Sequence, residues 1–380
     1  MKKYSERSTR VGTCKIRSMT LEAYKRGAIM LAQGSPGFDT PEHIKKAAIE
    51  SIVAGHNQYA PMIGYKELRE AVSEKLKSYN KIEADPESEV IITVGAMEGL
   101  SATMLGLVDP DDEVILINPC FSTNRASVEM AHGKKVEVPL EGDELKLNEE
   151  AMKGAVTGKT RAILLNSPQN PSGRVLGKGE LKAIADIAMD KDLFVLSDEI
   201  YEYLLYDGNR HHSIGSFDGM QERTVTLSGF SKTYAMTGWR VGYVTCEKEL
   251  MKPITELHTH LVIAAPSMGQ HAALAALKGP QDCVEEMRNG YEERRDYIVP
   301  ELEKLGLKPF MPQGAYYVFS DVSGLGMDGD AFTEKALEEA NVAVVPGEEF
   351  GEEWKSYVRM NFSRPMKELE NAVESLGRVF

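Results

Sequence analysis

Polar residues that could do chemistry follow several short apolar runs of the sequence, at the point where each run ends. Lys232 and Arg240 lie in a loop rich in hydroxyl groups and glycine, Asp198 and Tyr201 follow a second apolar run, and Asn170 lies in a turn after a third. A lysine amine can attack a carbonyl. A carboxylate that closes a buried strand must meet a cation or hydrogen-bond donors, because burying it alone is costly. Each residue also has an ordinary interpretation, as a surface lysine, a helix cap or a turn residue.

A second set of residues could hold an anion and a flat ring. Gly95, Ala96 and Met97 form a turn that follows an apolar run and opens a helical segment. The free N–H groups and the positive dipole end of such a helix suit a phosphate group. Phe121 follows another apolar run, where its ring could cover a flat ligand or simply pack in the core.

Together these residues predict one ligand, pyridoxal 5′-phosphate, and no metal. The Lys232 amine would form a Schiff base with the aldehyde, and Asp198 would keep the pyridine nitrogen protonated so that the ring accepts electrons. Asn170 and Tyr201 would hydrogen-bond the 3′-oxygen, and Phe121 would cover the ring. The phosphate would be bound by helix amides, hydroxyl groups and a guanidinium group, from Gly95, Ala96, Met97, Ser228, Ser231 and Arg240. We predict that Lys232, Asp198 and Tyr201 are catalytic.

The same motifs resemble those of the fold-type-I, class I/II pyridoxal-phosphate aminotransferases. Residues 228–242, SGFSKTYAMTGWRVG, resemble the lysine signature of that family. The order and separations of Asn170, Asp198 and Lys232 match the family pattern, as do segments that begin at Gly34 (GSPGFDTP) and Tyr357 (YVRM). The resemblance extends from about residue 16 to the end of the chain and is greatest to the aspartate and aromatic aminotransferase branch.

The resemblance implies further residues and a partner. In that family, the residue matching Arg359 holds the substrate α-carboxylate, the backbone amide matching Gly34 donates to it, and Phe121 and Asn170 also face the substrate. The tyrosine matching Tyr59 reaches the cofactor phosphate of the neighbouring subunit, which implies a homodimer. The implied reaction moves an amino group between an L-amino acid, with aspartate or an aromatic amino acid as leading donors, and a 2-oxo acid such as 2-oxoglutarate, by ping-pong kinetics.

Two positions depart from the family pattern. Gly229 stands where many relatives have serine, and Met97 stands where one aspartate-specific branch has a lysine that holds the distal carboxylate. The phosphate loop therefore gives no support for aspartate specificity, and aromatic, branched and other dicarboxylic donors stay open.

The elements that must position these residues are strands alternating with helices. Leu181, Ile184, Ala185 and Ala188 recur at helical spacing, and residues 65–79 behave likewise. Alternating strands and helices predict a mostly parallel sheet, whose chemistry lies at the carboxyl ends of its strands. The predicted strands are 90–94, 113–118, 136–139, 161–166, 194–198, 224–228 and 241–245.

The predicted fold is α/β, with a large domain in which helices flank a mostly parallel mixed sheet, plus a smaller α+β domain. With the family resemblance, this is the fold type I of pyridoxal-phosphate transferases. From about residue 280, charged helical segments flank two further predicted strands, 315–321 and 342–345. We predict an N-terminal segment, 1–35, that contributes to the active site and the small domain. The large cofactor-binding domain would cover 36–275 and the small domain 276–380.

Composition bounds the partners and the compartment. The 380 residues include 58 acidic and 44 basic side chains, which give a net charge of −14. This balance argues against nucleic acid or an anionic membrane as a partner. No apolar run approaches the length of a membrane span, and no signal peptide is visible. The four cysteines are scattered, which favours the reducing cytoplasm.

Two other functions remain as alternatives: a carbon–sulfur (β) lyase on the same scaffold, and a regulator that binds the cofactor without turnover. Residues 324–329, GLGMDG, match a dinucleotide-binding fingerprint, but the aspartates around them would repel a pyrophosphate. The histidines of the pairs His211–His212 and His258–His260 have no acidic or thiolate neighbours at ligand spacing. We interpret them as surface or packing residues.

Overall fold

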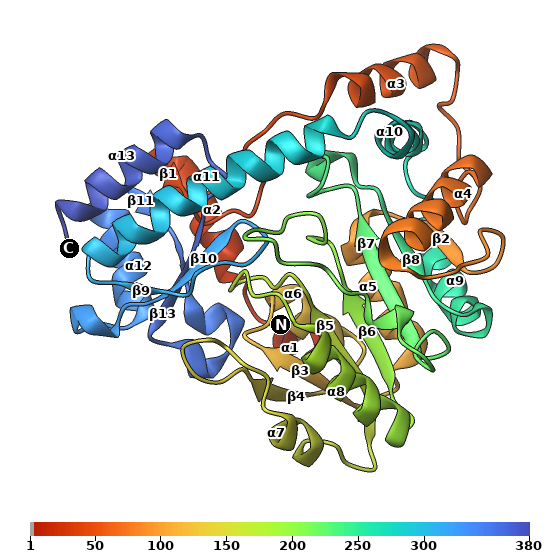
Figure 1. Cartoon of the computed structure of the whole chain (residues 1–380), viewed down its shortest axis with the longest axis horizontal. Coiled ribbons are helices and arrows are strands. Elements are labelled where there is room, and N and C mark those ends of the chain that lie inside the picture. The colour runs from red at the N-terminus through yellow and green to blue at the C-terminus, as the bar shows by residue number, and fades with distance from the viewer. Residues whose placement is uncertain (1–3) are drawn as a thin grey trace.

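The computed structural model describes residues 4–380, which form a larger and a smaller unit (Figure 1). The larger unit is built on a seven-stranded sheet in the order β2-β8-β7-β6-β5-β3-β4. Only β8 runs antiparallel to its neighbours in this sheet. The predicted mostly parallel mixed sheet is therefore confirmed. The strand bounds are Val90–Thr93 for β2, Glu113–Asn118 for β3, Lys134–Pro139 for β4, Thr160–Asn166 for β5, Phe194–Asp198 for β6, Thr224–Gly229 for β7 and Gly242–Thr245 for β8.

Helices pack on both faces of this sheet because each has one apolar stripe to bury. In α8, the buried residues include Leu181, Ile184, Ala185 and Ala188, the set that shows the helical period in the sequence. The predicted helix at 65–79 is an α-helix that ends in a π-helical turn, Leu76–Asn80. The helices of this unit include α3 (Glu42–Val53), α4 (Lys66–Lys75), α5 (Gly95–Leu107), α6 (Ser122–Met130), α7 (Glu149–Gly154), α8 (Lys178–Asp190), α9 (Lys248–Val262) and α10 (Ser267–Lys278).

The smaller unit has a four-stranded antiparallel sheet in the order β12-β13-β10-β9. The predicted strand 342–345 is two short strands, β11 and β12, and the predicted strand 315–321 begins only at Tyr317, because Ala315 has a φ of 57° and turns the chain. The strands are β9 (Lys308–Pro309), β10 (Tyr317–Asp321), β11 (Val342–Ala343), β12 (Val345–Pro346) and β13 (Tyr357–Asn361), and the helices are α11 (Asp282–Lys304), α12 (Gly329–Glu338) and α13 (Met366–Gly377).

The N-terminal region lies beside the smaller unit. Its helices are α1 (Glu6–Val11) and α2 (Lys15–Arg26), and its strand β1 (Ile29–Met30) pairs in parallel with β11. The chain then crosses to the larger unit, so residues 33–35 lie between the two units. The domain boundaries at residues 35 and 275 stay a prediction.

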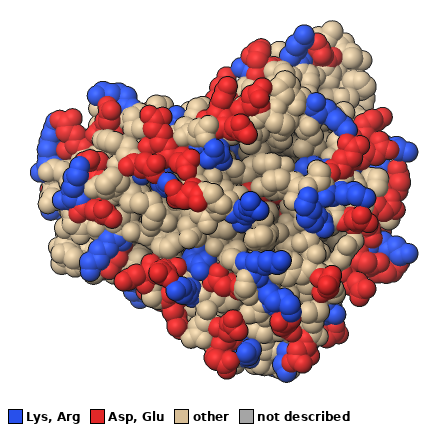
Figure 2. All heavy atoms as spheres, in the orientation of Figure 1, with Lys and Arg blue, Asp and Glu red and all other residues tan. Residues whose placement is uncertain are grey.

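The surface carries charges of both signs. On the face in Figure 2, acidic and basic side chains are interspersed over both units. Among residues 4–380, no helix combines the length and the apolar character needed to cross a membrane.

Candidate active site

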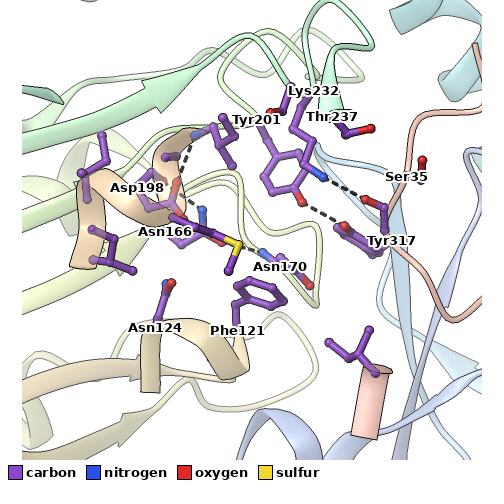
Figure 3. Close-up of a pocket in the computed structure, with 18 of the residues that line it drawn as sticks. Ser35, Phe121, Asn124, Asn166, Asn170, Asp198, Tyr201, Lys232, Thr237 and Tyr317 are labelled. Atoms are coloured by element: carbon purple, nitrogen blue, oxygen red, sulfur yellow. Dashed lines mark hydrogen bonds between the residues drawn. The ribbon is translucent and has the colours of Figure 1, made fainter. Parts of the chain in front are cut away.

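A cavity of about 250 Å³ lies where the carboxyl ends of β5, β6 and β7 face the smaller unit (Figure 3). Parallel strands bring these ends to one edge of the sheet, as the alternating pattern predicts. Most of the predicted site residues line this cavity: Gly34, Ala96, Met97, Phe121, Asn170, Asp198, Tyr201, Ser231, Lys232, Arg240 and Arg359.

Lys232 follows β7, and its side chain projects into the cavity (Figure 3). Its Nζ donates a hydrogen bond to the Gly34 carbonyl oxygen at 2.8 Å. Burial lowers the pKa of the Lys232 amine to about 7, and the positive charge of Arg359 acts in the same direction. A large share of this amine is therefore neutral near pH 7, which is the form that attacks a carbonyl.

Asp198 ends β6 and lines the same cavity. One carboxylate oxygen accepts a hydrogen bond from the Ile200 backbone N–H at 3.2 Å. Burial raises the pKa of the Asp198 carboxyl to about 7, although the nearby Lys232 charge acts against this shift. A cationic ligand atom beside Asp198 would stabilise its ionised form, as a protonated pyridine nitrogen would do.

Asn166 ties the ends of two strands together beside Asp198. Its side-chain nitrogen donates to the Asp198 backbone carbonyl at 2.9 Å, and its side-chain oxygen accepts from the Asn170 backbone N–H at 2.8 Å. Arg359 Nη1 donates to the Asn170 side-chain oxygen at 3.0 Å. The amide nitrogen of Asn170 is therefore the group that can donate to a ligand.

The N-terminus of α5 and the loop after Lys232 form one end of the cavity, which has groups that could hold an anion. Gly95 has a φ of +73°, and a Cβ there would lie 2.6 Å from Arg240 Nη2, so a side chain does not fit. Gly95 itself does not line the cavity, but it lets Arg240 pack against the start of the helix. Ser231 and Thr237 add hydroxyl groups to the lining. A guanidinium group, two hydroxyls and helix amides are together a suitable set for phosphate.

Ser228 lies outside this set, so the structure gives no support to the prediction that it binds the cofactor. Its hydroxyl donates to Glu202 Oε1 at 2.8 Å, its side chain is buried, and it does not line the cavity. Side chains alternate between the two faces of a strand. Leu227 lines the cavity, so Ser228, the next residue, points to the other face of β7. Ser231, beyond the end of β7, does line the cavity.

Arg359 on β13 has an unused donor beside the cavity. Its side chain is buried, and its Nη2 donates to the Ala32 carbonyl. Its Nε, also buried, has no hydrogen-bond partner among residues 4–380. An unpaired buried N–H is costly, and a carboxylate bound at this edge of the guanidinium group would satisfy it.

Gly34 lines the cavity next to the ring of Tyr317. A Cβ at Gly34 would lie 2.0 Å from the Tyr317 hydroxyl oxygen, so only glycine fits at this position. Tyr59, by contrast, lies outside the cavity with 80% of its surface exposed.

Several cavity residues escape the sequence analysis, among them Asn124, Asn166, Thr237 and Tyr317. Asn124 lies one helical turn after Phe121, a spacing that could have indicated it, and its buried Nδ2 has no partner among residues 4–380. Thr237 lies within the signature segment between Lys232 and Arg240. Nothing in the local sequence indicates Tyr317, because its position depends on the pairing of β10 with β13.

His211 does have acidic neighbours in space. Its Nε2 lies 2.7 Å from Glu199 Oε2, and Glu202 is near enough that the three side chains could share a cation. The sequence could not show this because the contact is formed by the turn after β6. Lys75 already supplies a positive charge to this cluster, since its Nζ lies 2.5 Å from Glu202 Oε1. His258 Nδ1 contacts Glu98 at 3.1 Å.

Comparisons with known proteins agree with this arrangement. The family model for aminotransferase class I and II matches residues 26–376. The chain is 41% identical over 356 residues to the aromatic-amino-acid aminotransferase 2 of Thermococcus litoralis, which covers 93% of this chain and 92% of that protein. It is also 41% identical over 379 residues to the aspartate aminotransferase of Pyrococcus abyssi, with 99% and 97% covered. The chain belongs to the class I and II aminotransferase family.

A solved structure of this family has the same fold over its whole length. The aspartate aminotransferase of Thermus thermophilus, solved with maleate, superposes with a TM-score of 0.95 at 36% identity and covers 100% of both chains. The predictions of the family, of fold type I, of an aminotransferase activity (EC 2.6.1.-) and of pyridoxal 5′-phosphate as cofactor are therefore confirmed.

The cavity of this aminotransferase fits its cofactor on three observations. Lys232 offers a partly buried amine with a lowered pKa. The Gly95 backbone leaves room for Arg240 beside the helix N-terminus. Asn124 carries a buried N–H group without a partner among the described residues.

Proposed function

We propose that this aminotransferase moves an amino group between aspartate or an aromatic amino acid and a 2-oxo acid such as 2-oxoglutarate, with Lys232, Asp198 and Tyr201 as its catalytic residues. The observation that carries the proposal is the convergence on one cavity of three groups: an amine with a lowered pKa, a partly buried carboxyl group and a buried guanidinium group. The choice of donors rests on the names of the two similar proteins, one an aromatic and one an aspartate aminotransferase.

Each residue has a role that follows from its position. When bound, the cofactor supplies an aldehyde that takes up the amino group and a ring that accepts electrons. Lys232 would hold this aldehyde in the resting enzyme, and its amine would take the proton from the substrate α-carbon. Asp198 holds the ring-nitrogen proton, and Asn170 and Tyr201 donate to the 3′-oxygen.

The remaining groups orient the two ends of the bound molecules. Arg359 binds the substrate α-carboxylate with the backbone N–H of Gly34, and Phe121 covers the cofactor ring while it also contacts the substrate. The phosphate is bound at the start of α5 by the amides of Ala96 and Met97 and by the side chains of Ser231, Thr237 and Arg240.

One experiment tests the reaction. Purified holoenzyme is mixed with aspartate, tyrosine, phenylalanine, glutamate, alanine or kynurenine, and the absorption of the bound cofactor is followed. Conversion to the pyridoxamine form, reversed by 2-oxoglutarate, supports transamination. Release of pyruvate and ammonia without a 2-oxo acid would indicate the lyase, and an unchanged spectrum with every donor would indicate a regulator.

We further propose a homodimer in which Tyr59 reaches the cofactor phosphate of the partner subunit. Tyr59 is 80% exposed, and it borders a surface hollow with Val94, which directly precedes the α5 phosphate cradle. Large apolar side chains are exposed nearby, at Met62 and at Leu261 on α9, and these two segments meet where His258 contacts the Met62 carbonyl. A second copy of the chain would cover them.

Mixing two inactive or weakened variants tests the shared site. Lys232→Ala and Tyr59→Ala homodimers each lack one contribution to both of their sites. After subunit exchange, a mixed dimer has one site with both Lys232 and Tyr59. Activity should therefore rise above the sum of the separate samples, whereas simple additivity at every ratio would contradict a shared site.

We also propose a cytoplasmic location. All four cysteines of the chain are free thiols in the structure, which suits a reducing compartment. Finding the native enzyme in an oxidising compartment would overturn this proposal.

A further inference from the structure

We propose that Tyr317 is a positioning residue that orients the hydroxyl proton of Tyr201 toward the cofactor and supports the guanidinium group of Arg359. The inference rests on the proposed roles of Tyr201 and Arg359. Tyr317 is on β10, only 1% exposed, and lines the cavity. Its hydroxyl oxygen lies 2.9 Å from that of Tyr201, and the two side chains point toward each other in Figure 3.

The geometry of this pair restricts where the protons can go. Burial raises the pKa of both tyrosines above the ordinary value, so both hydroxyls keep their protons near neutral pH. Each phenol has one proton to donate. Tyr201 can donate to the 3′-oxygen of the cofactor only when it accepts from Tyr317, because its single proton cannot serve both. The Tyr317 hydroxyl therefore selects the orientation of Tyr201 that the reaction needs.

The ring of Tyr317 contacts the group proposed to bind the substrate. The guanidinium carbon of Arg359 lies 4.5 Å from the centre of this ring. The pairing of β10 with β13 brings them together, since Arg359 is opposite Phe319, two residues along from Tyr317 on the same face. A cation over an aromatic face is attracted to it, so the ring limits the positions that Arg359 can take.

These two contacts can be separated by substitution. Tyr317→Phe removes the hydroxyl and keeps the ring, whereas Tyr317→Leu removes both. Tyr291→Phe is the matched control, because Tyr291 is a buried tyrosine that packs against Tyr316, lies outside the cavity lining, and has a hydroxyl with no hydrogen-bond partner among residues 4–380.

The primary measurement is the pH midpoint of the absorption change of the bound cofactor, taken without substrate. Donation from Tyr201 stabilises the negatively charged 3′-oxygen, so weaker donation should move the midpoint upward. We expect Tyr317→Phe to raise it by about 0.5–1 pH unit, the size of one neutral hydrogen bond, and Tyr291→Phe to leave it unchanged. Tyr317→Leu should in addition raise the KM for the amino acid more than Tyr317→Phe does.

A double variant distinguishes positioning from a general loss of packing. In a Tyr201→Phe background, the further change Tyr317→Phe should not move the midpoint, because its effect acts through the Tyr201 hydroxyl. A shift of the same size in that background, an unchanged midpoint in Tyr317→Phe alone, or an equal shift in Tyr291→Phe would overturn the proposal.

The test survives the failure of other claims. Once unbound cofactor is removed, only folded protein contributes the absorption, so a misfolded fraction lowers its amplitude and not its midpoint. If the protein fails to transaminate any donor, the proposed function falls, but the midpoint can still be measured. If transamination occurs and the midpoint does not shift, only the role of Tyr317 falls.

Discussion

Replacing Lys75 with methionine should destabilise the fold by several kcal/mol, because it breaks an ion pair that is almost completely buried. The exposed fractions of the Lys75 and Glu202 side chains are 8% and 2%. Lys75 Nζ donates to Glu202 Oε1 at 2.5 Å, to Asn80 Oδ1 at 2.8 Å and to the Tyr243 hydroxyl at 3.0 Å. All three ammonium protons therefore have partners, and Lys75→Met removes them together.

The size of the stability loss depends on how well Glu202 is still compensated after Lys75 is removed. Removing one member of a buried ion pair costs about 3–5 kcal/mol, because the other charge is left uncompensated. Glu202 would still accept hydrogen bonds from Asn80 Nδ2 and Ser228 Oγ, each at 2.8 Å. These donors place the expected loss at the lower end, about 3 kcal/mol. The double variant Lys75→Met/Glu202→Gln should recover part of it, because no uncompensated charge remains.

The assay is unfolding in guanidinium chloride at one protein concentration with saturating cofactor, since dimerisation and cofactor binding both add to stability. The control is Lys182→Met on α8, whose partner is Asp186 and whose side chains are 59% and 54% exposed. It should cost less than about 1 kcal/mol. A loss for Lys75→Met no larger than that of the control would refute the reasoning.

The pH dependence gives a second check on the same pair. Burial alone would raise the pKa of Glu202, but Lys75 and the hydrogen bonds hold it below the ordinary value. A carboxyl group with a lowered pKa in the folded state stabilises the fold above its unfolded pKa and loses this contribution as the pH falls. The stability difference between the wild type and Lys75→Met should therefore shrink as the solution becomes acidic.

Three further outcomes are expected for the cavity. The rate at which cofactor-free enzyme binds pyridoxal 5′-phosphate should rise with pH about a midpoint near 7, because burial lowers the pKa of the Lys232 amine to about 7. Stopped-flow absorption measures this rate, with the reaction of the cofactor and a free amine as the control. A midpoint near the pKa of an ordinary lysine would contradict the prediction. Arg359→Lys should raise the KM for amino acids about 10-fold or more with a smaller change in the spectrum of the bound cofactor, because an ammonium group cannot replace a bidentate guanidinium group; an unchanged KM in steady-state assays would exclude the carboxylate role. Asp198→Ala should lower kcat by at least about 10²-fold, as removal of a preorganised charge does. Single-turnover kinetics measure this loss, and a smaller one would contradict the role of Asp198.

The sequence predicts the cavity well where a residue closes a buried strand. Lys232, Asp198 and Asn170 come after consecutive parallel strands, and the rules of parallel sheets bring such strand ends to one edge. Their convergence needs no knowledge of side-chain packing. This is why separated motifs, each weak by itself, indicate one site.

Residues whose position depends on packing or register escape such reasoning. Ser228 and Ser231 are both hydroxyl residues near the end of β7. Which of them faces the cavity depends on the side to which each side chain points in the folded strand and loop. Tyr317 meets Tyr201 because the smaller unit packs against the larger one. The contact of His211 with Glu199 likewise exists only in the folded turn after β6.

The covalent bond between Lys232 and the cofactor is the central claim, and reduction with borohydride followed by peptide mapping tests it most directly. The account predicts that holoenzyme treated in this way carries the cofactor on the peptide that contains Lys232, and that the Lys232→Ala protein carries none. A label on another lysine, or no label on freshly reconstituted wild-type enzyme, would contradict it.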